Sequence, residues 1–491
     1  MLSQLLFVCC AAAAAASANA RNTPRLVTPS PRFRISPLDG SVIALPTADQ
    51  LAFQDREMGM LIHFEIATYL SIDGCNGVPG LVPEPALFDP TLLNTDQWMS
   101  SIVASGAKYA TLVAKHNCGF TTWPSAVTFE TRDNTTSRYN YTIADSPVVG
   151  ADVPGMFSTS AEKAGIGHGF YYSTVVNNFL NVQNSLVNAT WGPGEIRITN
   201  DTYDQIVIAQ LTELWTKYGN LTELWFDGGY SASQQARITA LLQEHQPQAC
   251  IFNSCDANGT ACLSANSIRW IGTETGLPNE EIWSTGVTND GGSPTSPFFA
   301  PAECDTTLQS GIRWFWGVNQ PLRPISEMIE VYHQTVGRNC LLELDLAPDR
   351  SGLIPATHAA RYKELGDFIR SCYGPGSAVG SVANSTTGPT VTLVFDFPTS
   401  IDRIVLMEDQ TAGQVIRGYE VHAKIVDASG MNGTLNVPMT LVSSGKSVGH
   451  KRIDIFNTPI TVTEIVVNAI KFVDVPVWRS VSVHLCDSLP S

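Results

Sequence analysis

The chain has 491 residues, of which 44% are hydrophobic and 15% are charged, and its formal net charge is −16. This composition excludes a disordered chain, and the length predicts two or three globular domains. No run of lysine or arginine residues offers the basic face that nucleic-acid binding requires, so we expect no nucleic-acid partner. The net negative charge of the chain favours neutral substrates over polyanions.

The first twenty residues predict a signal peptide. Residues 5–16 are almost wholly apolar, and the segment ends in the Ala-x-Ala motif Ala18-Asn19-Ala20 before Arg21. Such a segment is typical of a secretory signal, so we expect cleavage after Ala20 and secretion of the rest of the chain. A buried, alanine-rich helix is the alternative. No later stretch is long and apolar enough to span a bilayer, and we expect no membrane partner.

Two further features favour export. Nine of the eleven cysteines remain once Cys9 and Cys10 leave with the signal peptide, so we expect disulfides, with one thiol unpaired and the pairing open. Eight Asn-x-Ser/Thr tripeptides predict an N-glycosylated protein. Their asparagines are Asn134, Asn140, Asn188, Asn200, Asn220, Asn258, Asn384 and Asn432. No spacing of Cys and His matches a zinc site, and we expect neither a metal nor a cofactor.

From about residue 50 to 372, short apolar runs alternate with helix-like stretches. The strand candidates are, in chain order, residues 58–64, 107–115, 167–173, 221–227 and 249–253. Helix-like segments lie between them, such as residues 95–105 and 203–218. Such alternation predicts a parallel α/β domain, and the length fits a (β/α)8-type barrel, which needs about 250 residues plus insertions.

The composition changes after Cys372. A Gly-Pro-Gly-Ser linker at 374–377 precedes β-rich runs at 390–397, 401–407, 415–425, 453–456, 461–467 and 481–485. Alternation of apolar and polar residues in several of these runs predicts an antiparallel β-sandwich. We therefore divide the chain into a signal peptide (1–20), an N-terminal extension (21–46), a (β/α)8-like domain (47–372) that we expect to be catalytic, and a C-terminal β-sandwich domain (373–491).

Polar residues end several of the apolar runs. In a (β/α)8 barrel the active site lies at the carboxyl ends of the strands, so the side chains at these ends are the informative ones. We expect five of them to converge on one rim. They are His63, His116, Tyr171, Asp227 and, after the strand-like residues 267–271, Glu274.

Asp227 is the clearest candidate among them. Aspartate is unfavourable inside strands, so its position directly after Trp225 and Phe226 needs a reason. The structural alternative is a turn carboxylate that caps the next helix. The functional interpretation is a nucleophile beside aromatic walls that exclude water and stack on a sugar. Glycoside hydrolysis needs two carboxylates, and Asp227 and Glu274 would supply them from different strand ends.

Several segments together resemble the α-L-fucosidase family of glycoside hydrolases (family 29). They include 59–64 (GMLIHF), 115–116 (KH), 119–125 (GFTTWPS), 225–228 (WFDG), 269–274 (RWIGTE), 313–315 (RWF), 336–339 (VGRN) and 447–453 (SVGHKRI). The resemblance spans about residues 50–490. These segments occur together and in order, which is far more specific than any one of them.

The resemblance implies a retaining, double-displacement mechanism. Asp227 matches the catalytic nucleophile of the family. Glu274 matches the acid/base, and Glu280, Glu281 and Glu303 are the reserve candidates for that role.

The resemblance also implies a set of residues that bind the substrate. His63, His116, Tyr171 and Trp225 match pocket residues, and a neutral histidine offers the donor and the acceptor that a sugar hydroxyl requires. Asn117 stands where the family usually has a histidine and can still hydrogen-bond. We expect Trp123 and Trp314 to pack against the apolar side of the sugar. This sequence also departs from the usual pattern of the family at 341–345 (LLELD), where the family usually has Leu-Leu-Leu-Asn.

We therefore expect a secreted, exo-acting α-L-fucosidase whose partner is a fucosylated glycan or oligosaccharide. One alternative is a non-catalytic, lectin-like relative that keeps the pocket, against which the presence of both Asp227 and Glu274 argues. Another is a different retaining glycosidase on the same fold, such as a galactosidase. The C-terminal domain would be structural or weakly carbohydrate-binding.

Overall fold

The computed structural model describes residues 30–486 apart from 77, 79, 189, 191–194, 257–261, 279 and 427–436. The expected signal peptide and two of the expected glycosylation sites, Asn258 and Asn432, lie outside the described residues. Of the other six such asparagines, five are exposed and Asn188 is half-buried. Within the described part of the chain, no helix combines the length and the apolar character needed to cross a membrane.

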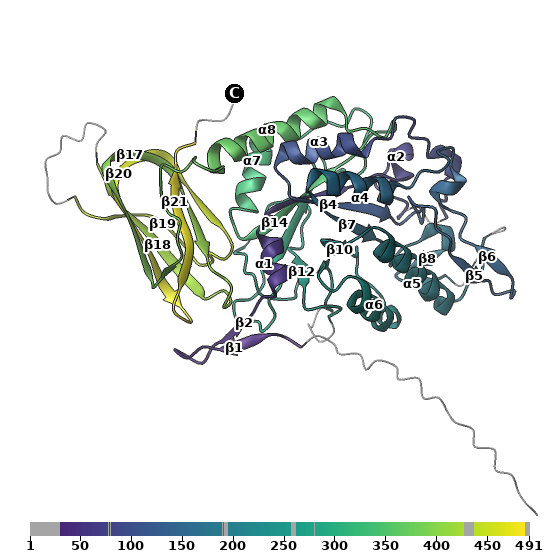
Figure 1. Ribbon diagram of the computed structural model, residues 1–491, viewed down its shortest axis with the longest axis horizontal. Coiled ribbons are helices and arrows are strands. Elements are labelled where there is room, and N and C mark those ends of the chain that lie inside the picture. The colour runs from purple at the N-terminus through teal and green to yellow at the C-terminus, as the bar shows by residue number, and fades with distance from the viewer. Residues whose placement is uncertain are drawn as a thin grey trace, which may run out of the picture.

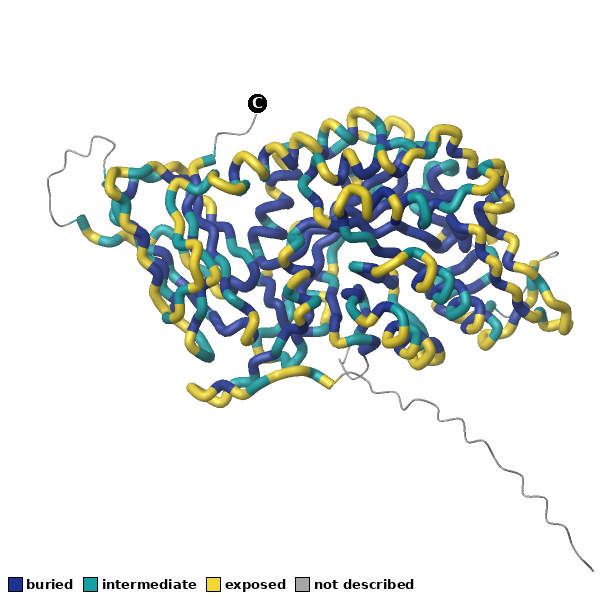
Figure 2. The backbone as a smooth tube through the Cα atoms, in the orientation of Figure 1, coloured by how far each residue is buried: buried dark blue, intermediate teal, exposed yellow. Residues whose placement is uncertain are grey.

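Eight parallel strands close into a barrel in the larger domain (Figure 1). Around the barrel they pair in the order β10 (Glu223–Trp225), β11 (Cys250–Phe252), β12 (Ser267–Trp270), β13 (Ala302–Thr306), β14 (Cys340–Leu346), β3 (Met58–Ile62), β4 (Tyr109–Lys115) and β7 (Gly167–Tyr172). Nearly all of their residues are buried, as expected of parallel strands covered on both faces (Figure 2). The predicted (β/α)8-type barrel is confirmed.

Helices surround the barrel strands. The longer ones are α3 (Thr95–Ser105), α4 (Val153–Ala164), α5 (Asn200–Lys217), α6 (Ala232–His245), α7 (Ile325–Gln334) and α8 (Ala356–Tyr373), and α2 (Ala67–Leu70) is a single turn. The two helices expected at 95–105 and 203–218 are α3 and α5. Helix α5 begins earlier than expected because the Thr199 side chain accepts a hydrogen bond from the Thr202 backbone N–H and so caps it.

The regular alternation of strands and helices is interrupted after β11 and resumes with α7 after β13. Among the described residues, the connections from β11 to β12 and from β12 to β13 contain no helix, and the second of them is the long loop 271–301. Helix α1 (Ala48–Gln54) supports this side of the barrel, since Gln50 donates hydrogen bonds to the carbonyls of Ser267 and Phe299. Short strands complete the N-terminal segment and the loops. They are β1 (Phe33–Ile35), β2 (Val42–Ala44), β5 (Thr128–Glu130), β6 (Thr136–Arg138), β8 (Val182–Gln183) and β9 (Leu186–Val187).

The C-terminal domain is an antiparallel sheet, shown on the left of Figure 1. Its strands are β15 (Gly380–Val382), β16 (Thr386–Thr387), β17 (Thr390–Glu408), β18 (Ile416–Ile425), β19 (Thr440–Gly445), β20 (Arg452–Phe472) and β21 (Val477–His484). Register shifts interrupt the pairing of the long strands β17 and β20, and such irregularities bend a strand. Side chains from β17, β18, β20 and β21 share one apolar core. The β-sandwich predicted from alternation is thus built from one continuous hydrogen-bonded sheet.

Covalent and polar contacts join the two domains. Ser447 donates a hydrogen bond to the Ile282 carbonyl at 2.6 Å, and the His450 backbone N–H donates to Asn339 Oδ1 at 2.7 Å. Of the nine cysteines that the structure describes, Cys250 is the free thiol, as the odd count requires. The four disulfides are Cys75–Cys118, Cys255–Cys262, Cys304–Cys340 and Cys372–Cys486. The last of them ties helix α8 to the segment after β21.

Candidate active site

Asp227 lies at the carboxyl end of β10, as the second residue after the strand. A turn with left-handed backbone follows it at once, since Gly228 and Gly229 have φ of 68° and 80°. The Tyr171 hydroxyl, at the end of the neighbouring strand β7, donates a hydrogen bond to Asp227 Oδ2 at 2.9 Å. Solvent reaches the Asp227 side chain, but protein atoms surround it on most sides. This burial raises its pKa above the ordinary value, while the Tyr171 hydroxyl and the Gly228 N–H act in the opposite direction.

A stack of rings fixes the Tyr171 hydroxyl against Asp227. Trp225 stacks on Phe252 with ring centroids 3.7 Å apart, and Tyr171 stacks on Trp225 at 5.4 Å. His116 stacks on the other side of Tyr171, also at 5.4 Å. The stack joins the ends of β11, β10, β7 and β4, and close packing of this kind leaves each ring little freedom. Tyr171 is therefore held in the orientation in which its hydroxyl donates a hydrogen bond to Asp227.

His63 and His116 are buried and neutral. Burial lowers the pKa of His63 well below its usual value, and the neighbouring His116 adds to the effect. Burial and the charge of Lys115 lower the pKa of His116 to about 3. His63 Nδ1 lies 2.9 Å from Asp345 Oδ1, whereas His116 Nδ1 has no hydrogen-bond partner among the described residues. An unpaired ring nitrogen in a buried position is suited to a hydroxyl of a ligand.

Glu274 lies on the long loop after β12. Its backbone carbonyl accepts a hydrogen bond from Thr306 Oγ1 at 2.8 Å, and its Oε2 accepts one from the Trp314 indole at 3.4 Å. Burial raises the pKa of Glu274, Trp314 opposes that rise, and the charges of Asp227 and Asp73 add to it. Asp227 is therefore close enough for its charge to oppose the ionisation of Glu274.

The three reserve candidates occupy other positions. Glu280 Oε1 accepts a hydrogen bond from the Gly291 backbone, and Glu281 forms an ion pair with Arg452 of the C-terminal domain. Glu303 is buried inside the barrel, where it accepts hydrogen bonds from Trp225 and Tyr109. The charge of Asp227 raises the pKa of Glu274 and is not among the charges that raise the pKa of Glu303, so Glu274 is the better partner for Asp227.

Asp73, which the sequence analysis did not single out, supports this arrangement. Its Oδ1 accepts hydrogen bonds from the backbone N–H groups of Trp314 and Phe315, at 3.1 and 3.0 Å. The Trp314 ring lies 5.0 Å from the His63 ring and donates to Glu274, so it bridges the two. Asp73 comes from the loop after α2 and follows no barrel strand, so strand-end reasoning could not find it.

Two expected substrate-binding residues have other contacts. Asn117 Oδ1 accepts a hydrogen bond from the Cys75 backbone N–H at 2.6 Å, next to the Cys75–Cys118 disulfide. Trp123 has no exposed surface, and its indole donates to Glu213 on α5 at 2.8 Å. The structure thus does not bring Trp123 to the rim, and this position does not fit the expected packing on a sugar. A role for Asn117 in sugar binding stays a prediction.

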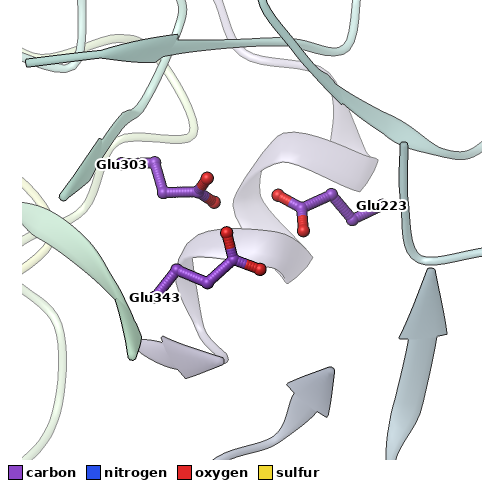
Figure 3. A group of neighbouring side chains, drawn as sticks. All are labelled: Glu223, Glu303 and Glu343. Carbon is purple, nitrogen blue, oxygen red and sulfur yellow. The ribbon is translucent and has the colours of Figure 1, made fainter. Parts of the chain in front are cut away.

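Three glutamates form a cluster inside the barrel. They lie within the strands, whereas the candidate site lies at the carboxyl ends of the strands. Glu223, Glu303 and Glu343 come from β10, β13 and β14, and their carboxyl groups point toward one another (Figure 3). One oxygen of each lies within 4.8 Å of those of the others, and all three side chains are fully buried. No described donor makes a hydrogen bond to either oxygen of Glu343.

Three negative charges at such short distances in a buried position would repel one another strongly. Burial raises the pKa of Glu303 and of Glu343 well above the ordinary value, and the neighbouring Glu223 raises both further. Glu303 accepts hydrogen bonds with both oxygens, which favours its charged form. Glu343 has no such donors, so its charged form is the least favoured of the three.

The site described above combines two neighbouring carboxyl groups, stacked aromatic rings and neutral histidines at the carboxyl end of a barrel. This is the layout of a glycoside hydrolase. The family model described as Alpha-L-fucosidase matches residues 84–374, more than half of the chain. The protein therefore belongs to the α-L-fucosidase family, as its resemblance predicted.

Individual relatives agree with this assignment. The chain is 29% identical over 367 residues to Alpha-L-fucosidase 1 of Arabidopsis thaliana, an alignment that covers 70% of this chain and 64% of the plant protein. It is 28% identical to Putative alpha-L-fucosidase 1 of Oryza sativa, with 70% and 63% covered. The chain thus spans less than two thirds of the length of both plant proteins. A solved structure of a putative α-L-fucosidase from Bacteroides thetaiotaomicron is 27% identical, with 90% of this chain and 99% of that chain covered and a TM-score of 0.77.

Replacing Glu343 by glutamine is expected to stabilise the protein at neutral pH, by about 1–3 kcal/mol. Because its pKa is raised in the folded state, the stability that Glu343 contributes is present below the ordinary carboxyl pKa and is lost as the pH rises through the folded-state value. Glutamine supplies N–H donors to Glu223 and Glu303 at every pH. The gain in Tm of Glu343→Gln over the native chain should therefore be largest near about pH 8 and vanish near about pH 4.

Thermal melts across this pH range, in buffer with EDTA, measure the effect. The exposed Glu130 provides the control, since Glu130→Gln should show no pH-dependent gain. A Tm of the native chain that rises with added Ca²⁺ or Mn²⁺, in a way that Glu343→Gln abolishes, would instead identify the glutamate cluster as a cation site.

Proposed function

We propose that this protein is a secreted, exo-acting α-L-fucosidase that removes terminal α-L-fucosyl residues from glycans with retention of anomeric configuration. The observation that carries the proposal is the placement of Asp227 and Glu274 on one rim, with the Tyr171 hydroxyl bound to Asp227. Relatives that carry the name α-L-fucosidase support the choice of sugar.

In the first step, the Asp227 carboxylate attacks the anomeric carbon of fucose. The bond from that carbon to the aglycone oxygen breaks, and Glu274 gives its proton to the leaving oxygen. The two environments suit these roles. The Tyr171 and Gly228 donors favour the charged form of Asp227, while burial and the nearby charge of Asp227 favour a protonated Glu274.

In the second step, Glu274 acts as a base. It takes a proton from water, the water oxygen attacks the anomeric carbon, and the bond to Asp227 breaks to release fucose. His63 and His116, being neutral, can each donate and accept a hydrogen bond to sugar hydroxyls. Trp314, half-buried beside Glu274, offers an apolar face to the sugar ring.

Three features of the chain outside the active site support secretion: the N-terminal segment, the glycosylation tripeptides and the disulfides. The apolar segment ending in Ala18-Asn19-Ala20 is a signal sequence in this proposal, and the eight tripeptides are sites of N-glycosylation. Four disulfides are characteristic of proteins that fold in an oxidising compartment.

Asp227→Ala should abolish hydrolysis of an aryl α-L-fucoside while leaving the Tm close to that of the native chain. A covalent nucleophile has no substitute, so the loss should be about 10⁴-fold or more. Proton NMR of the native reaction should show α-fucose as the first-formed sugar. A first product of β-fucose would contradict retention, and a native chain that binds fucose without hydrolysis would favour the lectin-like alternative.

Glu274→Gln should slow fucosides with poor leaving groups far more than aryl fucosides, because an activated leaving group needs little protonation. The measurement compares kcat/KM for a fucosyl disaccharide and a nitrophenyl fucoside in both proteins. Glu280→Gln is the matched control and should leave both values unchanged. Equal losses on the two substrates would assign the acid role to another residue.

Tyr171→Phe should move the acidic limb of the pH profile of kcat/KM to higher pH. The Tyr171 hydroxyl lowers the pKa of Asp227, so its removal leaves only the Gly228 N–H to oppose the effect of burial, and the charged nucleophile then forms only at higher pH. Below that limb the rate should fall roughly tenfold, the effect of one hydrogen bond to a charged group. Tyr172→Phe is the control, since the Tyr172 hydroxyl donates to Gln210, away from Asp227. An unmoved limb in Tyr171→Phe would contradict the role given to this hydrogen bond.

A further inference from the structure

Asp345 is a buried carboxyl group that contacts a residue of the candidate site. It is the last residue but one of β14, and it is fully buried. Its Oδ1 lies 2.9 Å from His63 Nδ1, at the carboxyl end of the seam where β14 pairs with β3. Its Oδ2 is also buried and has no hydrogen-bond partner among the described residues. Within the described part of the chain, the His63 ring is therefore the one side-chain partner of this carboxyl group.

The surroundings of His63 leave its other ring nitrogen, Nε2, for a ligand. The ring centroids of Trp314 and Phe315 lie 5.0 and 5.1 Å from that of His63, and the His116 centroid lies at 6.0 Å. Packing on these sides and the contact of Nδ1 with Asp345 fix the orientation of the ring. Nε2 makes no hydrogen bond with a described residue and, unlike His116 Nδ1, is not closed off from solvent. A sugar hydroxyl can therefore reach His63 only at Nε2.

The contact with Asp345 decides which nitrogen of a neutral His63 ring carries the hydrogen. A protonated carboxyl group donates to Nδ1, so the ring hydrogen is then on Nε2. A carboxylate instead accepts from an Nδ1 that carries the hydrogen, and Nε2 is left as an acceptor. The two states of Asp345 thus present opposite hydrogen-bonding functions to a sugar hydroxyl.

The environment of Asp345 favours the protonated carboxyl group. Burial raises the pKa of Asp345 well above the ordinary value, and the charge of Asp73 raises it further. The Leu346 backbone N–H and the charge of Arg313 act in the opposite direction. From α8, the Tyr362 hydroxyl donates to the backbone carbonyl of Asp345 and so leaves the carboxyl group unchanged.

His63 does not remove this proton. Burial lowers the pKa of His63 well below its usual value, and the neighbouring His116 lowers it further. An ion pair between His63 and Asp345 would also keep a hydrogen on Nε2, since a charged ring carries one on each nitrogen. As long as the pair holds two protons, Nε2 is therefore a donor wherever the shared proton lies.

We propose that Asp345 is a positioning residue that holds His63 as a hydrogen-bond donor, with its Nε2–H directed at a hydroxyl oxygen of the sugar. The inference rests on the proposed function and assigns a direction to a hydrogen bond that a neutral histidine can make in either sense. Because Asp345 is fully buried, it acts through His63 and does not touch the sugar. The hydroxyl that accepts from Nε2 keeps its own hydrogen for another acceptor of the site.

Two substitutions of Asp345 test this role. Asp345→Leu keeps the branched shape of the side chain but cannot bond to His63, and kcat/KM for a nitrophenyl α-L-fucoside should fall about tenfold. Asp345→Asn offers Nδ1 a donor from its carboxamide, so it should recover most of that loss. Glu343→Gln is the matched control, since Glu343 is another fully buried carboxyl group of β14 and makes no hydrogen bond to His63. It should leave kcat/KM as in the native chain.

The kinetic outcomes are distinct. A loss in Asp345→Asn as large as that in Asp345→Leu would show that a carboxylate is required, and it would overturn the donor role of His63. Native kcat/KM in Asp345→Leu, at native Tm, would overturn the positioning role of Asp345.

Nitrogen NMR of the native chain, with isotope-labelled histidine, tests the proposal without any change at Asp345. Ring nitrogens with and without a hydrogen resonate apart, and the signals that disappear in His63→Gln belong to His63. At neutral pH the Nε2 of His63 should carry the hydrogen, and a bare Nε2 overturns the proposal. A native chain that does not release fucose from the aryl fucoside overturns the proposed function instead, and this spectrum still decides the state of His63.

Discussion

The pairing of β14 with β3 closes the barrel, and the candidate site depends on this closure. Five residue pairs, from Leu342–Met58 to Leu346–Ile62, join segments from opposite ends of the domain. Loop-closure entropy opposes contact between such distant segments, and burial of the apolar side chains of these two strands offsets it. The contact between His63 and Asp345 lies at the carboxyl end of this seam. His63, a residue of the candidate site, is thus positioned only when the last strand has joined the first.

The sequence predicted most of the barrel, and the strands it missed share a physical cause. Continuous apolar runs marked β3, β4, β7, β10 and β11, but β13 and β14 contain acidic residues at alternate positions, which interrupt the apolar pattern. Those residues, Glu303, Asp305, Glu343 and Asp345, are buried inside the barrel or at its rim, beside polar side chains of other strands. A pattern of hydrophobicity cannot distinguish a buried carboxyl group from an exposed one, because the difference lies in neighbours contributed by other strands.

The candidate site was predictable where a residue follows a strand. Asp227, His63, His116 and Tyr171 lie at strand ends, and the closed barrel brings such ends together. Trp123 and Asp73 show where this reasoning stops. Both lie in long loops, and the side of a loop that faces the rim is decided by contacts with distant segments, such as Glu213 for Trp123 and Trp314 for Asp73. The pairing of the cysteines depends on the same long-range contacts.

The disulfide between Cys372 and Cys486 has a consequence for the order of biosynthesis. It connects the last helix of the barrel domain to the segment beyond the last strand of the C-terminal sheet, and the two cysteines are 114 positions apart in the sequence. The ribosome makes Cys486 only after the whole sheet domain, so the barrel domain emerges first and its Cys372 thiol must wait, unpaired, for its partner. During that interval Cys372 could pair with Cys250 or with any other free thiol. A disulfide isomerase in the compartment of synthesis would therefore act chiefly at this late bond.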